Sequence, residues 1–227
     1  LGILGRLKNV LYGDKRFSIY GCHRILMIKD FSYLESLGEG EYRFDIWIPP
    51  NSYIVLGRSK QETEDINLEY AKMDKIPIIR RITGGGTVLI DEGCIIIDIG
   101  FRAKNRNKTN DLLLQANTFL VEKFQSIGIP AEIDPKWPDI KVGNYKICGS
   151  CLGIRNTLFI YSASILYRSS TIEKIEYYLK LPQRSPDYRQ LRGHKDFLTS
   201  IDQVSSISQA EIVAVLKRDI QDAFQGH

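Results

Sequence analysis

The sequence predicts an α+β fold in a single domain. Strand-like and helix-like segments follow one another without the regular strand–helix–strand repeat of a parallel α/β sheet. No internal repeat, low-complexity tract or linker rich in proline, glycine or serine divides the 227 residues. We therefore expect one domain over residues 1–227.

The first predicted elements are strands. YRFDIWIP (42–49) alternates apolar and polar side chains as a half-buried strand does, and SYIVLG (52–57) is predicted to pair with it. A helix capped by Thr63 is expected to continue through Asp74, because apolar residues recur there at helical spacing. The short segment PIIRR (77–81) then predicts another strand.

Two more strands and a long helix are predicted next. TVLI (87–90) and CIIIDIGF (94–101) are strand-like, and the nearly continuous apolar run of the second predicts a central place in a sheet. A helix is expected from Thr109 to Ile127, because apolar residues recur every three and four positions before Gly128 ends it.

A hairpin is predicted in the second half of the chain, where three strands are expected. The segment VGNYKI has Gly143 and Asn144 at its centre, residue types that a tight hairpin turn requires, and it presents Lys146 just after the turn. The remaining elements are expected to be a second reversal (155–157), a strand (158–167), a helix (173–179), a polar loop and a last helix (208–224).

Composition and charge narrow the class of protein. A net charge of +4 is too small to indicate nucleic-acid binding, although it suits acidic ligands. No apolar run approaches the roughly 18 residues of a membrane span, and the basic start of the chain contains no export signal. Four cysteines without a regular framework favour reduced thiols. We expect a cytoplasmic protein that binds neither nucleic acid nor membranes.

Three consecutive glycines, Gly84 to Gly86, follow Arg80 and Arg81 and precede Asp91. Each glycine would weaken an ordinary strand by about 0.5 to 1 kcal/mol, so a close approach to the backbone is expected here. The spacing fits neither a phosphate loop nor a dinucleotide fingerprint. A bulge or tight bend is one explanation. The flanking charges favour another, a loop whose amides line a ligand with an apolar part and a phosphate or carboxylate.

These residues resemble the lipoate-protein ligase family, whose relatives are the biotin ligases and octanoyltransferases. The family motif Arg-Arg-x-Ser/Thr-Gly-Gly-Gly-x-Val, followed by an aspartate and a glycine, is matched by RRITGGGTVLIDEG at 80–93. An aspartate ahead of Gly-x-x-Lys-Ile-x-Gly-Ser is matched by PDIKVGNYKICGS at 138–150, and Val-Leu-Gly-Arg by IVLGR at 54–58. Order and spacing agree over about residues 47–167.

The resemblance implies a class II synthetase-like catalytic domain with a central mixed β-sheet flanked by helices. It implies an ATP-dependent ligase that activates lipoate or octanoate as an acyl-adenylate and transfers it to a lysine of a lipoyl-carrier acceptor protein. ATP and Mg²⁺ are the implied cofactors. Ligases of this family often have an accessory C-terminal domain, and none is evident in this sequence. Either the chain works as a single domain or a separate accessory subunit supplies the rest. An ATP-independent octanoyl or lipoyl transferase and a non-catalytic lipoyl- or biotin-binding protein stay open as alternatives.

The resemblance also implies the site residues. Lys146 is the expected catalytic residue, because a fixed ammonium stabilises negative charge that grows on carbonyl and phosphate oxygens. Asp139 is expected to help hold Mg²⁺ or the nucleotide. The other expected acyl- and adenylate-binding residues are Arg81, Thr83, Gly84, Gly85, Gly86, Thr87, Val88, Gly149 and Ser150.

The chain departs from the family pattern at several positions. Ile90 stands where family members usually have His, Cys94 where they have Asn, and Pro138 where they have Asn. Ser162 and Ala163 replace a usual His-Gly pair. These differences bear first on the preference for the acyl chain.

Two other features have simple alternatives to a functional role. Cys148 and Cys151 form a C-x-x-C pair, but residues three apart on a strand point to opposite faces, so a metal or redox site would require a bulge at 149–150.

A basic loop lies between the last two predicted helices. A solvated surface is favoured for this loop over contact with ATP phosphates or an acidic acceptor. That loop contains Arg184, Arg189, Arg192, His194 and Lys195.

Overall fold

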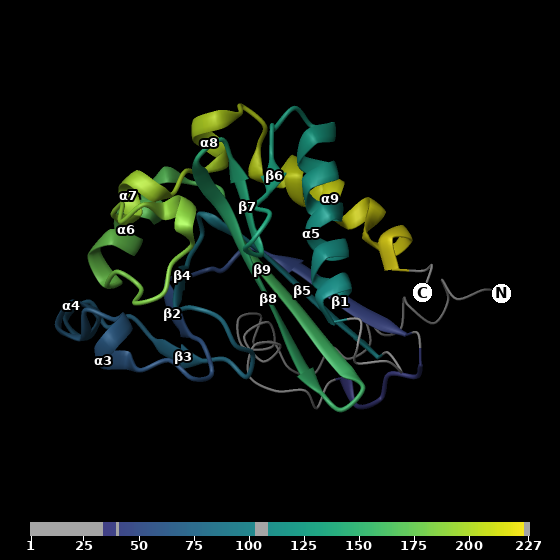
Figure 1. The fold of residues 1–227 in the computed structure, drawn as a ribbon, viewed down its shortest axis with the longest axis horizontal. Helices are drawn as coiled ribbons and strands as arrows, with labels where there is room; N and C mark the ends of the chain where they lie inside the picture. Colours follow the sequence, from purple (N-terminus) through teal and green to yellow (C-terminus); the bar gives the residue numbers. More distant parts are fainter. Residues whose placement is uncertain (1–33, 40, 103–108, 225–227) are drawn as a thin grey trace.

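The computed structural model describes residues 34–39, 41–102 and 109–224, which are built around a six-stranded antiparallel β-sheet (Figure 1). The strand order is β1-β5-β9-β8-β7-β6, and every neighbouring pair is antiparallel. The strands are β1 (Tyr42–Trp47), β5 (Cys94–Arg102), β6 (Glu132–Ile133), β7 (Asp139–Val142), β8 (Tyr145–Arg155) and β9 (Leu158–Leu166). The basic start of the chain, where no export signal is expected, lies outside the described residues.

A three-stranded sheet contains the mixed pairing, and the predicted α+β fold class is confirmed. Its order is β3 (Ile78–Arg80), β2 (Tyr53–Leu56), β4 (Val88–Ile90), with β2 parallel to β3 and antiparallel to β4. The predicted pairing of β1 with β2 is wrong, because β1 pairs with β5 instead. Pro49 and Pro50, which lack the backbone N–H that a ladder needs, separate β1 from β2.

Both faces of the six-stranded sheet are covered, as the apolar run of β5 predicts. Ile95, Ile97 and Ile99 face a core that includes α5 (Thr109–Ser126) and α9 (Gln209–Phe224). Ile96 belongs to a second core on the opposite face, which includes the small sheet and α6 (Ser169–Tyr178) (Figure 1). The long helices predicted at 109–127 and 208–224 are confirmed.

The helix predicted from Thr63 is wrong in detail. The segment forms two short helices, α3 (Glu62–Asp65) and α4 (Leu68–Met73), and neither begins with a side-chain cap. Between them Ile66 is extended, fully buried and bridged to Leu179. Burial of this side chain between the helices interrupts the continuous helix that local spacing predicts.

The predicted turns are confirmed. Gly143 has a positive φ of 56° in the two-residue turn between β7 and β8, and Asn156 has the same φ in the second reversal. Four strands follow α5, one more than expected, because the two-residue β6 is too short to give a pattern. Short helices then occupy the polar C-terminal region: η3 (Asp187–Arg189), α7 (His194–Phe197) and α8 (Ile201–Val204). None of the described helices is long and apolar enough to cross a membrane.

Candidate active site

A cavity of about 700 Å³ is lined by both sheets, by α6 and by the loop before η3. Part of its lining is apolar, with Val55, Ile90, Ile96 and Leu166 among the contributors. The lining also contains several cations: Lys60, Arg81, Lys136, Lys146, Lys180, Arg184 and Arg189. Such a cavity suits a ligand that has both an aliphatic part and an anionic part.

Most of the predicted site residues lie at this cavity. The ones that line it are Arg81, Gly85, Gly86, Thr87, Val88, Asp139, Lys146, Gly149 and Ser150. Thr83 and Gly84 are not part of the lining, and their binding roles stay predictions. Thr83 is buried beside Cys151, with Oγ1 at 3.4 Å from Sγ, because β8 packs behind the glycine loop.

The glycine loop (residues 84–86) is held in shape by Arg81. The guanidinium donates to the carbonyl oxygens of Gly84 at 2.8 and 3.0 Å and of Gly86 at 2.7 Å. Gly85 has a φ of +92°, and a Cβ there would lie 2.8 Å from Arg81 Nη2. Arg81 and Gly85 therefore shape the loop, whereas a Cβ on Gly86 would meet open space.

Thr87 joins the end of this loop to Asp65, a residue that sequence reasoning did not single out. Thr87 Oγ1 donates to Asp65 Oδ2 at 2.5 Å, and Asp65 is only 5% exposed. Its other oxygen accepts no hydrogen bond from the described residues, and Lys60 Nζ lies 3.6 Å away from it. Asp65 and Lys60 both line the cavity.

A bulge in β8 lets Lys146 and Gly149, which are three residues apart, both face the cavity. Lys146 lies opposite Lys141 and Cys148 lies opposite Ile140, so Ile147 is the extra residue. The bulge puts Lys146 and Gly149 on the same face of the sheet. A Cβ on Gly149 would lie 2.9 Å from Lys146 Nζ, so this glycine leaves the space that the ammonium occupies.

Asp139 fixes the Lys146 ammonium. Lys146 Nζ lies 2.7 Å from Asp139 Oδ1, and Tyr188 donates its hydroxyl to Oδ2 at 3.0 Å. Burial, followed by the negative charge of Asp139, raises the pKa of Tyr188, which keeps this donor protonated.

The Mg²⁺ role predicted for Asp139 does not fit these contacts well. Both carboxylate oxygens already have partners in Lys146 and Tyr188. In addition, the described residues contain no cluster of three or more His, Cys, Asp or Glu that could hold a metal ion. The geometry favours Asp139 as the residue that positions Lys146.

Asp98 is a third buried acid at the cavity, after Asp65 and Asp139. It accepts hydrogen bonds from Ser162 Oγ at 2.6 Å and from Trp47 Nε1 at 3.0 Å, and its exposed fraction is 0%. Burial raises the pKa of Asp98 to about 6 and the charge of Asp45 adds to the rise, while the two donors oppose it.

Asp98→Asn is expected to change how stability depends on pH. Because the folded pKa lies above the ordinary value of 3.8, the folded protein binds the extra proton more readily than the unfolded chain. The unfolding free energy of the unsubstituted protein should therefore fall, relative to the Asn variant, as pH rises from about 4 to about 6, by about 3 kcal/mol in total. Urea titrations at half-unit pH steps measure this difference, and a constant difference across the window would contradict it.

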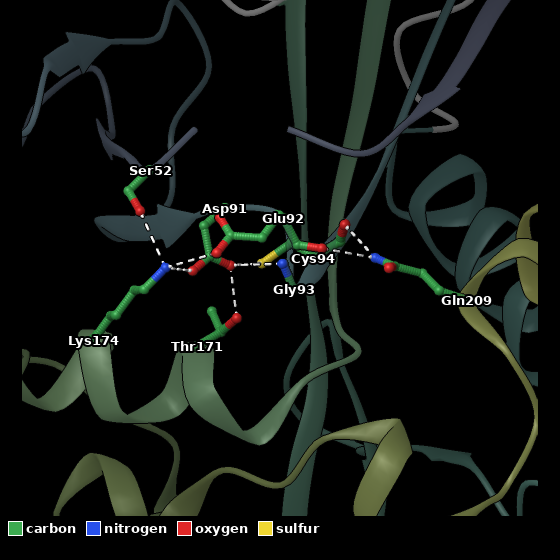
Figure 2. Close-up of polar contacts among 8 residues, drawn as sticks. All are labelled: Ser52, Asp91, Glu92, Gly93, Cys94, Thr171, Lys174 and Gln209. Carbon is green, nitrogen blue, oxygen red and sulfur yellow. Dashed lines mark hydrogen bonds and ion pairs between the residues drawn. The ribbon is translucent and has the colours of Figure 1, made fainter. Parts of the chain in front are cut away.

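Asp91, the aspartate of the glycine motif, connects the motif to α6 through hydrogen bonds and does not line the cavity. Figure 2 shows its carboxylate between the motif and α6. Oδ1 accepts from the Gly93 amide at 2.9 Å and from Thr171 Oγ1 at 2.6 Å, and Oδ2 accepts from Lys174 Nζ at 2.5 Å. Burial lowers the pKa of Lys174, but hydrogen bonding and charge from Asp91 and Glu92 outweigh it and raise the pKa.

The C-x-x-C pair does not form a joint site. Cys148 belongs to the helix-facing core, and burial raises its pKa to about 12. Cys151 is half-buried and lies beside Thr83 at the cavity. The bulge at Ile147 precedes both cysteines, so their side chains stay on opposite faces as strand alternation predicts.

Two arginines of the basic loop are structural, so a solvated surface is the wrong interpretation for them. Arg189 is 5% exposed and stacks on Phe197, with 4.6 Å between the guanidinium carbon and the ring centroid. Arg192 donates to the Asn144 carbonyl at 2.8 Å and so ties the loop to the hairpin turn. Arg184, in contrast, lies over the Trp137 ring at the cavity.

Fold and cavity together define an α+β domain with an ammonium group fixed at a cavity of a size that suits a small molecule. The chain belongs to the lipoyl protein ligase A/B catalytic domain family, whose model matches residues 32–221.

Individual relatives agree with this assignment. Lipoate–protein ligase 1 of Staphylococcus aureus is 30% identical over 134 residues, which cover 56% of this chain and 38% of that protein. Lipoate-protein ligase A bound with ATP superposes with a TM-score of 0.70 at 18% identity, over 81% of this chain and 72% of that one. A bipartite lipoate protein ligase from Thermoplasma acidophilum, solved with its E2 lipoyl domain, gives 0.74 at 19% identity, over 88% and 78%. The chain spans less than half the length of the first curated relatives, 44% and 38%.

Proposed function

We propose that this chain is the catalytic domain of an ATP-dependent lipoate–protein ligase. It activates lipoate or octanoate as an acyl-adenylate and passes the acyl group to a lysine of a lipoyl-carrier protein. The observation that carries the proposal is the Lys146 ammonium, held by Asp139 and placed over Gly149 in a cavity that is partly aliphatic and partly cationic. Family membership and the relatives named as lipoate ligases support it.

The reaction builds negative charge on oxygen twice. First the acyl carboxylate attacks the α-phosphate of ATP and pyrophosphate leaves; then a lysine amine attacks the activated carbonyl and AMP leaves. In this proposal the Lys146 ammonium stabilises the charge in both steps, and Asp139 and Tyr188 hold it in position. Lys60 and Arg184 are the cations proposed to meet the phosphates. Mg²⁺ would neutralise phosphate charge when bound, and we assign it no protein ligand.

Partners follow from the same proposal. The acceptor is a lipoyl domain, and a separate accessory subunit is proposed because the T. acidophilum relative is bipartite. The cytoplasmic location stays a prediction.

The deciding experiment measures pyrophosphate release by the chain with ATP and lipoate, without acceptor. Release that requires both substrates supports the ligase. Lipoate binding without ATP binding or pyrophosphate release would favour the transferase or the non-catalytic binding protein. A parallel reaction that contains the accessory subunit tests whether that subunit is needed.

Gly86→Val is expected to block the ligand without damaging the fold. A side chain at Gly86 would extend into open space at the cavity, so lipoate should lose at least about tenfold in affinity, which equals roughly 1.4 kcal/mol. Gly84→Val is the matched control, because its Cβ also meets open space but Gly84 does not line the cavity. Gly85→Val is not a clean test, since its positive φ strains the loop itself. Equal lipoate affinities for the Gly86 and Gly84 variants would argue against a ligand wall.

A further inference from the structure

The cavity contains a second lysine–aspartate pair, Lys60 and Asp65, which is built like the pair of Lys146 and Asp139. One carboxylate oxygen faces the ammonium in each pair, at 2.7 Å in Asp139 and at 3.6 Å in Asp65. The other oxygen accepts a hydrogen bond from a hydroxyl group in both pairs, and in the second pair the donor is Thr87. Both aspartates are buried, so each carboxylate is held in place beside its lysine.

Hydrogen bonds also fix the backbone of the Lys60–Asp65 pair. The Lys60 amide donates to the Gly57 carbonyl at 3.0 Å, and Arg80 Nη1 donates to the Lys60 carbonyl at 2.6 Å. At the end of α3, the Lys180 amide donates to the Asp65 carbonyl at 2.9 Å. Neighbouring segments of the chain therefore hold both members of the pair at the cavity.

The N–H groups of Lys60 remain available to a ligand. A separation of 3.6 Å is too long for a hydrogen bond, and among the described residues the Lys60 ammonium has no partner except Asp65. Two other cations of the lining, Arg81 and Lys180, donate instead to carbonyl oxygens of the glycine loop and of Thr63. Lys60 thus combines a fixed position with three N–H groups that the described protein groups leave unused.

The anionic groups of the substrates indicate what Lys60 meets. In the proposed function Lys146 meets the acyl carboxylate and the α-phosphate, which react with each other. The anionic groups that remain are the β- and γ-phosphates of ATP, which leave as pyrophosphate. Lys60 comes from a different part of the lining, the loop after β2 of the small sheet, whereas Lys146 lies on β8. A second ammonium at a separate place suits this second anionic group.

We infer that Asp65 positions the Lys60 ammonium for the β- and γ-phosphates of ATP. The inference rests on the proposed function, which assigns the α-phosphate to Lys146. Asp65 acts through Lys60: its negative charge holds the ammonium at the cavity, and its distance leaves the N–H groups to the phosphates. AMP lacks these two phosphates, so the pair should not contribute to binding of AMP.

The first test compares ATP with AMP by isothermal titration at one fixed concentration of Mg²⁺. Lys60→Met should raise the Kd for ATP about tenfold, because charge-assisted hydrogen bonds to the phosphates are lost, and should leave the Kd for AMP within about twofold. Lys72→Met is the matched control, since Lys72 is exposed on α4 and does not line the cavity. The control should leave both Kd values within about twofold.

The second test examines Asp65 itself. Asp65→Asn keeps the shape of the side chain and removes its charge, so it should raise the Kd for ATP about threefold and leave that for AMP unchanged. In the Lys60→Met background the same substitution should have no further effect on ATP, since Asp65 acts only through Lys60. Glu64→Gln is the matched control, because Glu64 is exposed, precedes Asp65 in α3 and does not line the cavity.

Two results would overturn the inference. Equal losses of affinity for ATP and AMP in Lys60→Met would place Lys60 away from the β- and γ-phosphates. Tighter binding of ATP in Asp65→Asn, to the same extent with and without Lys60, would show that Asp65 only repels the phosphates and does not position the lysine.

Failure of this phosphate site is separable from failure of the ligase. Pyrophosphate release by the unsubstituted chain, together with equal losses for ATP and AMP in Lys60→Met, rejects the phosphate site and leaves the ligase intact. A loss specific to ATP, without pyrophosphate release in the presence of lipoate, rejects the ligase and supports the phosphate site. Absence of ATP binding to the unsubstituted chain rejects both.

Discussion

Lys146→Met is expected to lower the rate of adenylate formation by about a hundredfold or more while the fold is kept. The substitution removes an ammonium that is already fixed by Asp139 where negative charge develops, and loss of such a preorganised donor typically has an effect of this size. Pyrophosphate release with lipoate and no acceptor measures it, on proteins with matched melting temperatures. ATP affinity should change much less than the rate.

Lys141→Met is the matched control. Lys141 lies opposite Lys146 in the same hairpin, but its ammonium pairs with Glu132 at 2.7 Å and it does not line the cavity. Its replacement should leave the rate within about twofold, since such ion pairs contribute about 1 kcal/mol or less. Similar rates for the Lys146 variant and the control would remove Lys146 from the mechanism.

Asp91→Ala is expected to destabilise the protein by about 3 kcal/mol. The buried Thr171 hydroxyl and the Gly93 amide would lose their acceptor, and each buried donor left without a partner costs about 1 to 3 kcal/mol. Lys174 is 32% exposed and can turn to solvent, so its share is small. Urea unfolding measures the difference.

Glu92→Ala is the control that tests whether loss of surface charge alone explains the effect of Asp91→Ala. Glu92 also pairs with Lys174, at 3.2 Å, but its side chain is 55% exposed, so its loss should cost less than about 1 kcal/mol. If both variants lost the same stability, the Asp91 network would be only a surface ion pair.

The sequence predicts the parts of the site that depend on local patterns. Gly143 and Asn144 predict the hairpin turn, and the sequence places Lys146 just after that turn. Asp98 was not singled out in the sequence, although it is the single acid in the apolar run of β5; its partner Ser162 lies 64 residues away, and only the β5–β9 register joins them.

Other features required the tertiary structure. Asp65 sits in a four-residue helix with no distinctive pattern, and only burial beside Thr87 brings it to the cavity. The sequence suggests a solvated charge cluster at Arg189 and Arg192, because it does not show that their guanidinium groups donate hydrogen bonds to backbone carbonyl oxygens. The predicted β1–β2 pair failed since strand order is set by long-range packing, which neighbours in sequence do not determine.

The extra residue in β8 allows residues 146–149 to face two sides of the sheet, the cavity and the core next to the helices. Ile147 and Cys148 both serve the core next to the helices, while Lys146 and Gly149 both serve the cavity. Uniform alternation would have assigned one residue of each pair to the wrong side. Removing Ile147 would restore that alternation and leave the lysine over Gly149, but it would take one apolar side chain from the core. Substitutions at 147 should consequently change the free energy of unfolding of the domain. Substitutions at 146 or 149 should instead change its turnover rate.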